Sequence, residues 1–191
     1  MERSSPEPGR GNGLVFWPVF LFLLLADLVT KAIAVYALGM YEPPRPVIGN
    51  TLRWVLVYNP GAAFGFHLGP YSRWIFMVLT AGALYVLWRL YRDTQPGDRP
   101  RTIALAMVCA GALGNLIDRI RSARGVVDFI DVGVGDTRWP TFNIADIAVS
   151  VGAFLLAWVL WGEDQRAEAA AAAAASTPAS SPVPSESREA S

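Results

Sequence analysis

Four stretches of the chain are long and apolar enough to cross a bilayer, which takes about 20 residues of α-helix. They cover residues 14–38, 72–91, 102–120 and 142–161. Tryptophans stand near most of their ends, where aromatic side chains anchor a helix at the membrane interface. No clean small-x-small cleavage site follows the first stretch, so we expect it to be retained as a span. The pattern predicts a membrane α-helical protein, a bundle of four transmembrane helices.

The segments between and outside the spans differ in character. Residues 39–71 contain NTLRWVLVYN and residues 121–141 contain GVVDFIDVGV, whose β-branched and aromatic residues predict short strands. The two connectors therefore predict a small β-rich region on one side of the bundle. Residues 1–13 and 163–191 are rich in Gly, Pro, Ser or Ala, so we expect a disordered N-terminal arm and a low-complexity C-terminal tail around a folded unit of residues 14–162.

Polar residues enter the spans on one side only. Consecutive spans run in opposite directions, so the end of the first, the end of the third and the start of the fourth lie on the same side as both connectors. The residues placed there at similar depth are Asp27, Lys31, Asn115, Asp118, Arg119, Asn143 and Asp146. Helical spacing puts each set on one face of its helix. A charge in the bilayer costs at least about 2.5–3.5 kcal/mol, so this layer is expected to face the bundle interior and to mark function.

Helix packing alone can explain part of this layer. Asp27 and Lys31 form an i,i+4 pair that either secures packing or serves the site, and the sequence leaves both readings open. Asp118 and Arg119 are adjacent, so each is expected to find its partner on another helix. The two asparagines fit interhelical hydrogen bonds. Outside the layer, Asp131 is expected to be an ordinary solvated loop carboxylate.

Asp128 and Asp146 have no such explanation. Asp128 lies between Val127 and Phe129 in an apolar, strand-like stretch just outside the third span, and Asp146 lies one turn into the fourth. The connector is short enough to bring them together. Two carboxylates in one apolar site do not both ionise comfortably, which yields one general base and one general acid. We therefore expect this pair to activate a water for attack on a peptide carbonyl.

Five motifs, in order along the chain, carry a resemblance to a known family. They are DLVTK (27–31), NPGAAFG (59–65), GALGNLIDR (111–119), VVDF (126–129) and FNIAD (142–146). At these motifs the chain resembles the lipoprotein signal peptidases, or signal peptidase II, of bacterial inner membranes. The resemblance implies a membrane aspartyl endopeptidase of lipoprotein maturation. Such an enzyme removes the signal peptide from prolipoproteins by cleaving before a diacylglyceryl-modified cysteine.

The resemblance also implies site residues and surroundings. The family's catalytic pair falls on Asp128 and Asp146. Its supporting or substrate-positioning residues fall on Asp27, Lys31, Asn59, Ala63, Gly111, Asn115, Asp118, Arg119, Phe142, Asn143 and Ala145. The resemblance implies a multi-pass protein of the bacterial cytoplasmic (inner) membrane, with both termini cytoplasmic, the β-rich region extracytoplasmic and the active site near the outer leaflet. Its partners would be diacylglyceryl-modified prolipoproteins and membrane lipid, and we expect a monomer without a cofactor.

Composition and the polar layer narrow the alternatives. The formal net charge is zero, so nucleic acid is not an expected partner, and a single histidine excludes a His-cluster metal site. The lone Cys109 is expected to pack as a small apolar residue. A small proton-coupled transporter would need polar access from both faces, whereas the other halves of the spans lack ionisable residues in their interiors. An assembly subunit would explain the asparagines but not two aspartates in apolar settings.

Overall fold

The computed structural model describes residues 11–40, 42–61 and 69–176. The helices are α1 (Gly13–Ala37), α2 (Ser72–Arg92), α3 (Arg99–Arg121) and α4 (Ile144–Ser176). The strands are β1 (Arg45–Ile48), β2 (Leu52–Asn59), β3 (Val126–Val134) and β4 (Thr137–Arg138), and a short 3-10 turn, η2 (Gly69–Tyr71), precedes α2. Each of these four helices contains an apolar window long enough to cross a membrane, which confirms the four predicted spans.

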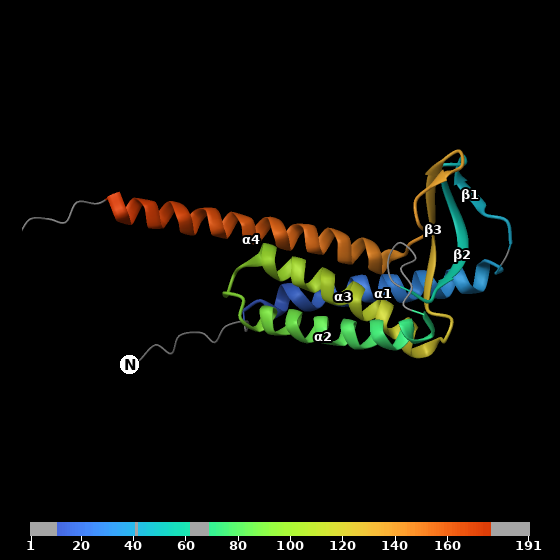
Figure 1. Cartoon of the computed structure of the whole chain (residues 1–191), viewed down its shortest axis with the longest axis horizontal. Helices are drawn as coiled ribbons and strands as arrows, with labels where there is room; N and C mark the ends of the chain where they lie inside the picture. The colour runs from blue at the N-terminus through green and yellow to red at the C-terminus, as the bar shows by residue number, and fades with distance from the viewer. Residues whose placement is uncertain (1–10, 41, 62–68, 177–191) are drawn as a thin grey trace, which may run out of the picture.

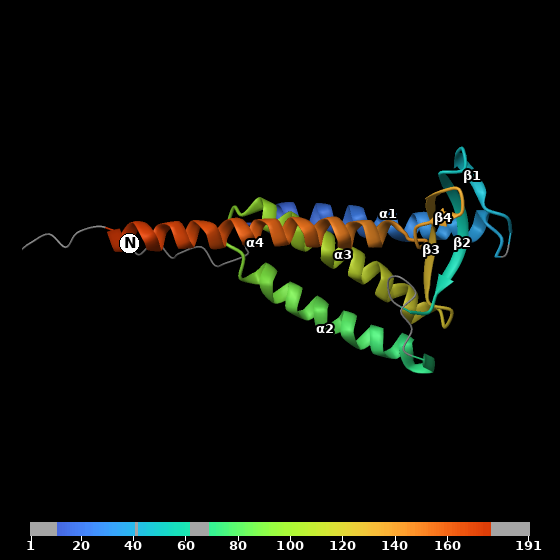
Figure 2. The same cartoon turned by 45° about the horizontal axis from the view of Figure 1, so that its top comes forward.

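The central helix of the bundle is α3. It packs against α1, α2 and α4, and both ribbon views show it between α2 and α4 (Figures 1 and 2). Two glycines permit this close packing. A Cβ on Gly111 would collide with the backbone carbonyl of Ala145 in α4, and one on Gly114 would collide with the carboxylate of Asp27 in α1. Small residues at such positions let membrane helices approach closely.

Apolar side chains fill the half of the bundle that lies away from the sheet. Phe16, Tyr91, Leu105 and Cys109 form a buried cluster there, with the rings of Phe16 and Tyr91 at a centroid distance of 4.1 Å. Cys109 is buried in this cluster, as predicted. The cluster occupies the part of the bundle through which a transporter would need a polar path, so the packing argues against that class.

The end of the predicted N-terminal arm belongs to the fold. The arm was expected to cover residues 1–13, but Asn12 is buried with only 2% of its surface exposed. Its side-chain amide donates to the carbonyl of Gln95 at 2.8 Å, and its Oδ1 accepts from the backbone N–H of Gly97 at 2.9 Å. A buried amide needs such partners, and the loop between α2 and α3 supplies them. Asn12 thereby ties the start of α1 to that loop.

The fourth helix continues well beyond the predicted end of its span. The prediction placed the span at 142–161 and a low-complexity tail from residue 163, whereas α4 extends to Ser176. The alanine run explains this extension, because Ala has the highest intrinsic helix propensity. Figure 1 shows this part of α4 projecting past the other helices. An ion pair of 2.9 Å between Arg101 Nη2 and Glu163 Oε2 joins α3 to α4 where the projection begins.

The two connectors form one antiparallel sheet at the other end of the bundle (Figure 1), which confirms the predicted β-rich region. Its strand order is β1-β2-β3-β4. In the β2–β3 ladder Val57 lies opposite Asp128 and Asn59 lies opposite Val126. Gly125, just before β3, has a left-handed φ of 100°, and a Cβ there would collide with the backbone carbonyl of Asn59. This close approach, which only glycine allows, sets Asn59 beside Asp128.

Candidate active site

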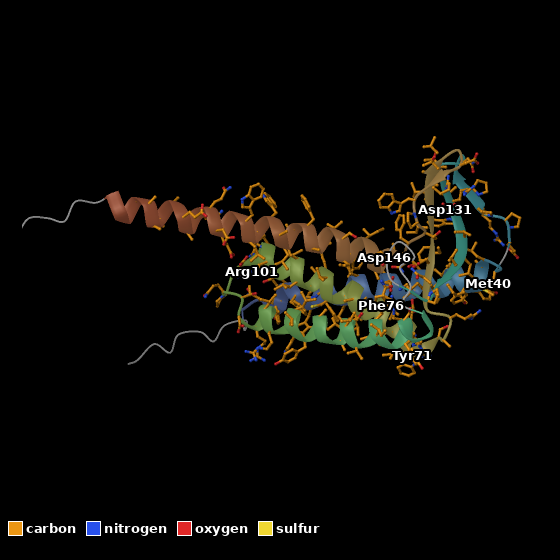
Figure 3. The ribbon with its side chains drawn as sticks, viewed as in Figure 1. Met40, Tyr71, Phe76, Arg101, Asp131 and Asp146 are labelled. Atoms are coloured by element: carbon orange, nitrogen blue, oxygen red, sulfur yellow. The ribbon has the colours of Figure 1, made fainter. Side chains whose placement is uncertain are left out.

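Asp128 and Asp146 line the same cleft. Asp128 comes from β3 and Asp146 from the first turn of α4, and the cleft has a volume of about 710 Å³. Side chains of α2, α3 and the segment 139–142 form its other walls. Figure 3 places Asp146 where α4 meets the sheet, at the opposite end of the bundle from Arg101. The fold therefore brings together two carboxylates that belong to different elements.

A reciprocal capping interaction fixes Asp146 at the start of α4. The backbone N–H of Asp146 donates to Asn143 Oδ1 at 2.9 Å, and the backbone N–H of Asn143 donates to Asp146 Oδ2 at 3.1 Å. A capping box works in the same way, since residues three apart satisfy N–H groups that the first helical turn leaves free. The positive end of the helix dipole also stabilises a carboxylate at this position. The position of Asp146 is thus set by four consecutive residues.

Asn143 contacts both carboxylates, that of Asp146 through its backbone N–H and that of Asp128 through its side-chain amide. Its Nδ2 donates to Asp128 Oδ1 at 2.7 Å and also lies within hydrogen-bonding distance of Asn115 Oδ1 (3.1 Å) and of the carbonyl of Val127 (3.2 Å). Asn143 is fully buried, so these hydrogen bonds are made away from bulk solvent, where they are strong. One asparagine therefore positions both Asp128 and Asp146.

Asp128 is almost entirely buried, with 2% of its surface exposed. Burial, and after it the charge of Asp146, raises the pKa of Asp128 to about 7, while hydrogen bonds from Asn59 and Asn143 oppose the shift. The bond from Asn59 runs from Nδ2 to Asp128 Oδ2 at 3.2 Å. A carboxyl group with a pKa near neutrality can exchange its proton under physiological conditions, as acid–base catalysis requires.

A buried ion cluster lies next to the carboxylates. Lys31 Nζ is 2.8 Å from Asp27 Oδ2 and 2.9 Å from Asp118 Oδ2, so the partner of Asp118 lies on another helix, as predicted. Lys31 also donates to Asn115 Oδ1 at 2.8 Å, and Asn115 Nδ2 donates to Asp146 Oδ1 at 2.8 Å. An ammonium group can only donate, so Lys31 fixes which end of the Asn115 amide faces Asp146.

Arg119 forms part of the cleft wall and has no carboxylate at ion-pair distance in the described part of the chain. Its Nη2 donates to the carbonyl of Gly61 at 2.8 Å and its Nη1 to that of Asn115 at 3.2 Å. Its hydrogen-bond acceptor outside its own helix is therefore a backbone carbonyl, and on another helix its guanidinium lies over the ring of Phe76 in α2, 5.8 Å from the ring centroid. Nε is buried and, among the described residues, has no hydrogen-bond partner. Arg119 thus retains a free donor beside the two aspartates.

The remaining motif residues shape the site. Ala145 is buried, and its backbone N–H donates to Asp27 Oδ1 at 2.9 Å, which joins the start of α4 to α1. Gly111 lets α3 lie against that same turn. Phe142 lines the cleft and pairs with β3 through backbone hydrogen bonds. Ala63 lies outside the described residues.

Asp131 is not the solvated loop carboxylate that the sequence predicted. It is 5% exposed and lies 2.6 Å from Arg53 Nη2 and 3.0 Å from Arg138 Nε. Burial would raise the pKa of Asp131, but hydrogen bonds from Arg138 and Arg53 outweigh it and hold the pKa below its ordinary value. The strand was visible in the sequence, whereas the register that sets Arg53 opposite Asp131 was not.

The fold and the site together define the class: a multi-pass α-helical membrane protein with a carboxylate-lined cleft where the bundle meets a small sheet. The profile of the family described as "Signal peptidase (SPase) II" matches residues 19–162. The chain belongs to the signal peptidase II family. It is therefore a peptidase, and a multi-pass protein of the bacterial inner membrane.

Individual relatives agree with this membership. A lipoprotein signal peptidase of Polynucleobacter necessarius is 39% identical over 155 residues, which cover 78% of this chain and 89% of the relative. One of Ralstonia nicotianae is 40% identical over 157 residues, which cover 80% and 88%. A bacterial membrane enzyme solved by the in meso method has a TM-score of 0.71 and 30% identity, with 79% of this chain and 90% of that chain covered.

Proposed function

We propose that this chain is an aspartic endopeptidase that removes the signal peptide from prolipoproteins by cutting before a diacylglyceryl-modified cysteine. Asp128 and Asp146 are its catalytic pair. The observation that carries the proposal is the shared cleft: two carboxylates from separate elements are held by one asparagine, and the pKa of Asp128 is raised to about 7. Family membership supports the substrate, because the relatives described above are lipoprotein signal peptidases.

The proposed reaction needs one ionised and one protonated carboxyl group. The ionised aspartate accepts a proton from a water molecule while the water oxygen bonds to the scissile carbonyl carbon. The protonated aspartate donates its proton to the carbonyl oxygen, which gives a neutral tetrahedral intermediate. The aspartate that took up the water proton then gives it to the leaving nitrogen and the C–N bond breaks. One hydroxyl of the intermediate returns its proton to the other aspartate, so the carboxyl product forms and the pair regains its starting state. The protons are shared by the pair, and the same steps apply whichever of the two aspartates starts as the base.

Neighbouring residues support this reaction in two ways. Asn143 and Asn115 hold the carboxylates through amide donors, so their separation does not depend on substrate. Arg119 has a buried Nε without a hydrogen-bond partner among the described residues, on the same cleft. We assign this donor to a backbone carbonyl of the substrate, because a peptide offers that acceptor and a buried donor without one is costly.

The position of the cleft supports a substrate that stays in the bilayer. The cleft wall on α2 is formed by residues that include Leu79 and Ala83, and the wall on α4 by residues that include Ile147 and Val151. A signal segment can therefore approach from the lipid side, while the acyl chains of the modified cysteine remain in the leaflet.

The first prediction concerns the lipid. Purified protein is expected to cut a diacylglyceryl-modified precursor peptide about a hundredfold faster, or more, than its unlipidated twin, measured as kcat/KM by mass spectrometry. The reason is that each buried methylene contributes about 0.8 kcal/mol of membrane or site affinity. An unlipidated peptide with the same sequence is the matched control. Equal rates for the two peptides would identify a general membrane peptidase and refute the proposed specificity.

The second prediction concerns orientation. We propose that the sheet is extracytoplasmic and that both termini and the α2–α3 loop are cytoplasmic. In a background with Cys109→Ala, cysteines introduced at Asn50 or Asp136 in the sheet turns are expected to react with a membrane-impermeant maleimide on intact cells. A cysteine at the exposed Gln95 is expected to react only after permeabilisation. The reverse labelling pattern would place the site on the wrong side for exported precursors.

A further inference from the structure

We propose that Asp131 is a positioning residue for the substrate: through Arg138 it braces the segment 139–142, which forms one wall of the cleft that holds Asp128 and Asp146. The inference rests on the proposed function for the identity of the substrate. It assigns a role in substrate affinity to a carboxylate that touches neither catalytic aspartate in any hydrogen bond or ion pair among the described residues.

Asp131 is the centre of a two-armed ion pair. Its Oδ2 accepts from Arg53 Nε at 2.7 Å on β2, and its Oδ1 accepts from Arg138 Nε at 3.0 Å on β4. Arg138 also donates to the backbone carbonyls of Asn50 at 2.8 Å and of Asp131 itself at 3.2 Å. One buried carboxylate therefore links β2, β3 and β4. Figure 3 shows Asp131 in the sheet, well away from Asp146.

The segment that follows Arg138 is held at both ends. Next to Arg138, the backbone N–H of Trp139 donates to the carbonyl of Val132 at 2.8 Å. At the other end, Phe142 exchanges backbone hydrogen bonds with Ile130, and Asn143 follows at once. Residues 139–142 all line the cleft. The side chain of Arg138 therefore anchors this wall at its N-terminal end, and the capping box follows its C-terminal end.

Loss of the Asp131 ion pairs is expected to affect substrate binding, whereas a change at the catalytic pair is expected to affect the chemical step. Asp128 and Asp146 take their hydrogen bonds from Asn59, Asn115 and Asn143, and none of these involves Asp131. Loss of the ion pairs would leave the wall held by its backbone hydrogen bonds alone, and so loosen it, while the carboxylates stay in place. A looser wall weakens substrate and transition state alike, and such uniform loss of binding raises KM without lowering kcat.

The test compares Asp131→Asn with Asp136→Asn, a matched change at an exposed position of the next turn. The readouts are the Kd of a non-cleavable diacylglyceryl peptide, the KM and kcat for the cleavable form, and Tm in detergent. For Asp131→Asn, Kd and KM are expected to rise about tenfold with kcat within about threefold of wild type, as for lost uniform binding. For Asp136→Asn all four values are expected to stay at the wild-type level.

A second variant keeps the proposal testable if Asp131→Asn does not fold. Arg138→Lys retains the charge but loses the planar fork that reaches several acceptors at once, so a smaller rise in Kd is expected. Unchanged Kd and KM in the folded variants would overturn the proposal, as would a loss of kcat at constant KM. Since Kd is measured without cleavage, it tests the wall even if the wild-type protein does not cut the peptide, which would refute the proposed function instead.

Discussion

Asp128→Asn and Asp146→Asn are each expected to lower kcat by about 10³-fold or more, because positioned acid–base groups contribute about 10²–10⁴-fold and the proposed mechanism uses both. An amide keeps the shape of the carboxyl group but can neither accept the proton of the attacking water nor hold an exchangeable acid proton. The measurement is single-turnover cleavage of the diacylglyceryl precursor by each purified variant. Near-normal turnover in either variant would refute the proposed aspartic mechanism.

Stability and binding separate a catalytic role from a structural one in these variants. The pKa of Asp128 is raised in the folded protein, so the folded state loses stability as pH rises from the ordinary carboxyl range through about 7. Removing that charge by Asp128→Asn should therefore leave Tm unchanged or higher at pH 8. Both variants are also expected to bind a non-cleavable lipopeptide with the wild-type Kd. A lowered Tm with lost binding would mean that the residue serves the fold rather than the chemistry.

The spans and the polar layer could be predicted because the bilayer constrains both. A helix must be long and apolar to cross it, and charges within it must face the protein, so Asp27, Lys31 and Asp118 were expected inside the bundle. The structure pairs them as one cluster. The helix α4 continues to Ser176, beyond the predicted span of residues 142–161, because the bilayer limits the length of the span but not that of the helix. Beyond the span, the high intrinsic helix propensity of the alanine run keeps α4 helical.

Side-chain contacts that depend on strand register, or whose partner is a backbone group, could not be predicted from the sequence. Asp131 meets Arg53 only because β2 and β3 pair in one particular register. Arg119 donates to the carbonyl of Gly61, and every residue offers the same carbonyl, so composition gives no signal. Asn143 and Asp146 stand three residues apart. From the sequence this spacing predicted only that they share a helix face, and it did not identify the capping interaction.

The buried cluster around Lys31 gives the other large expected effect. Lys31→Met is expected to destabilise the protein by about 3–5 kcal/mol, because it leaves buried carboxylates without their cation. The Lys31 and Asp27 side chains are only 4% and 1% exposed, and Asp118 faces the same ammonium group. Asp118→Asn should cost less, because Lys31 then retains Asp27. The measurement is Tm of both variants in the same detergent, and an equal loss in the two would contradict the assigned pairing.

Turnover should fall with Lys31→Met for a separate reason. Lys31 holds the oxygen of the Asn115 amide, and the nitrogen of that amide donates to Asp146. Without the ammonium group only the longer contact from Asn143 Nδ2, at 3.1 Å, holds that oxygen, so the amide is less firmly oriented toward Asp146. Compared with Lys31→Met alone, the double variant Asp27→Asn/Lys31→Met removes one further buried charge and keeps an acceptor for the Ala145 N–H, so it should recover part of the lost Tm. It should not recover kcat, because the double variant does not restore the Lys31 donor to Asn115. Recovery of kcat together with Tm would show that Lys31 acts on the site only through stability.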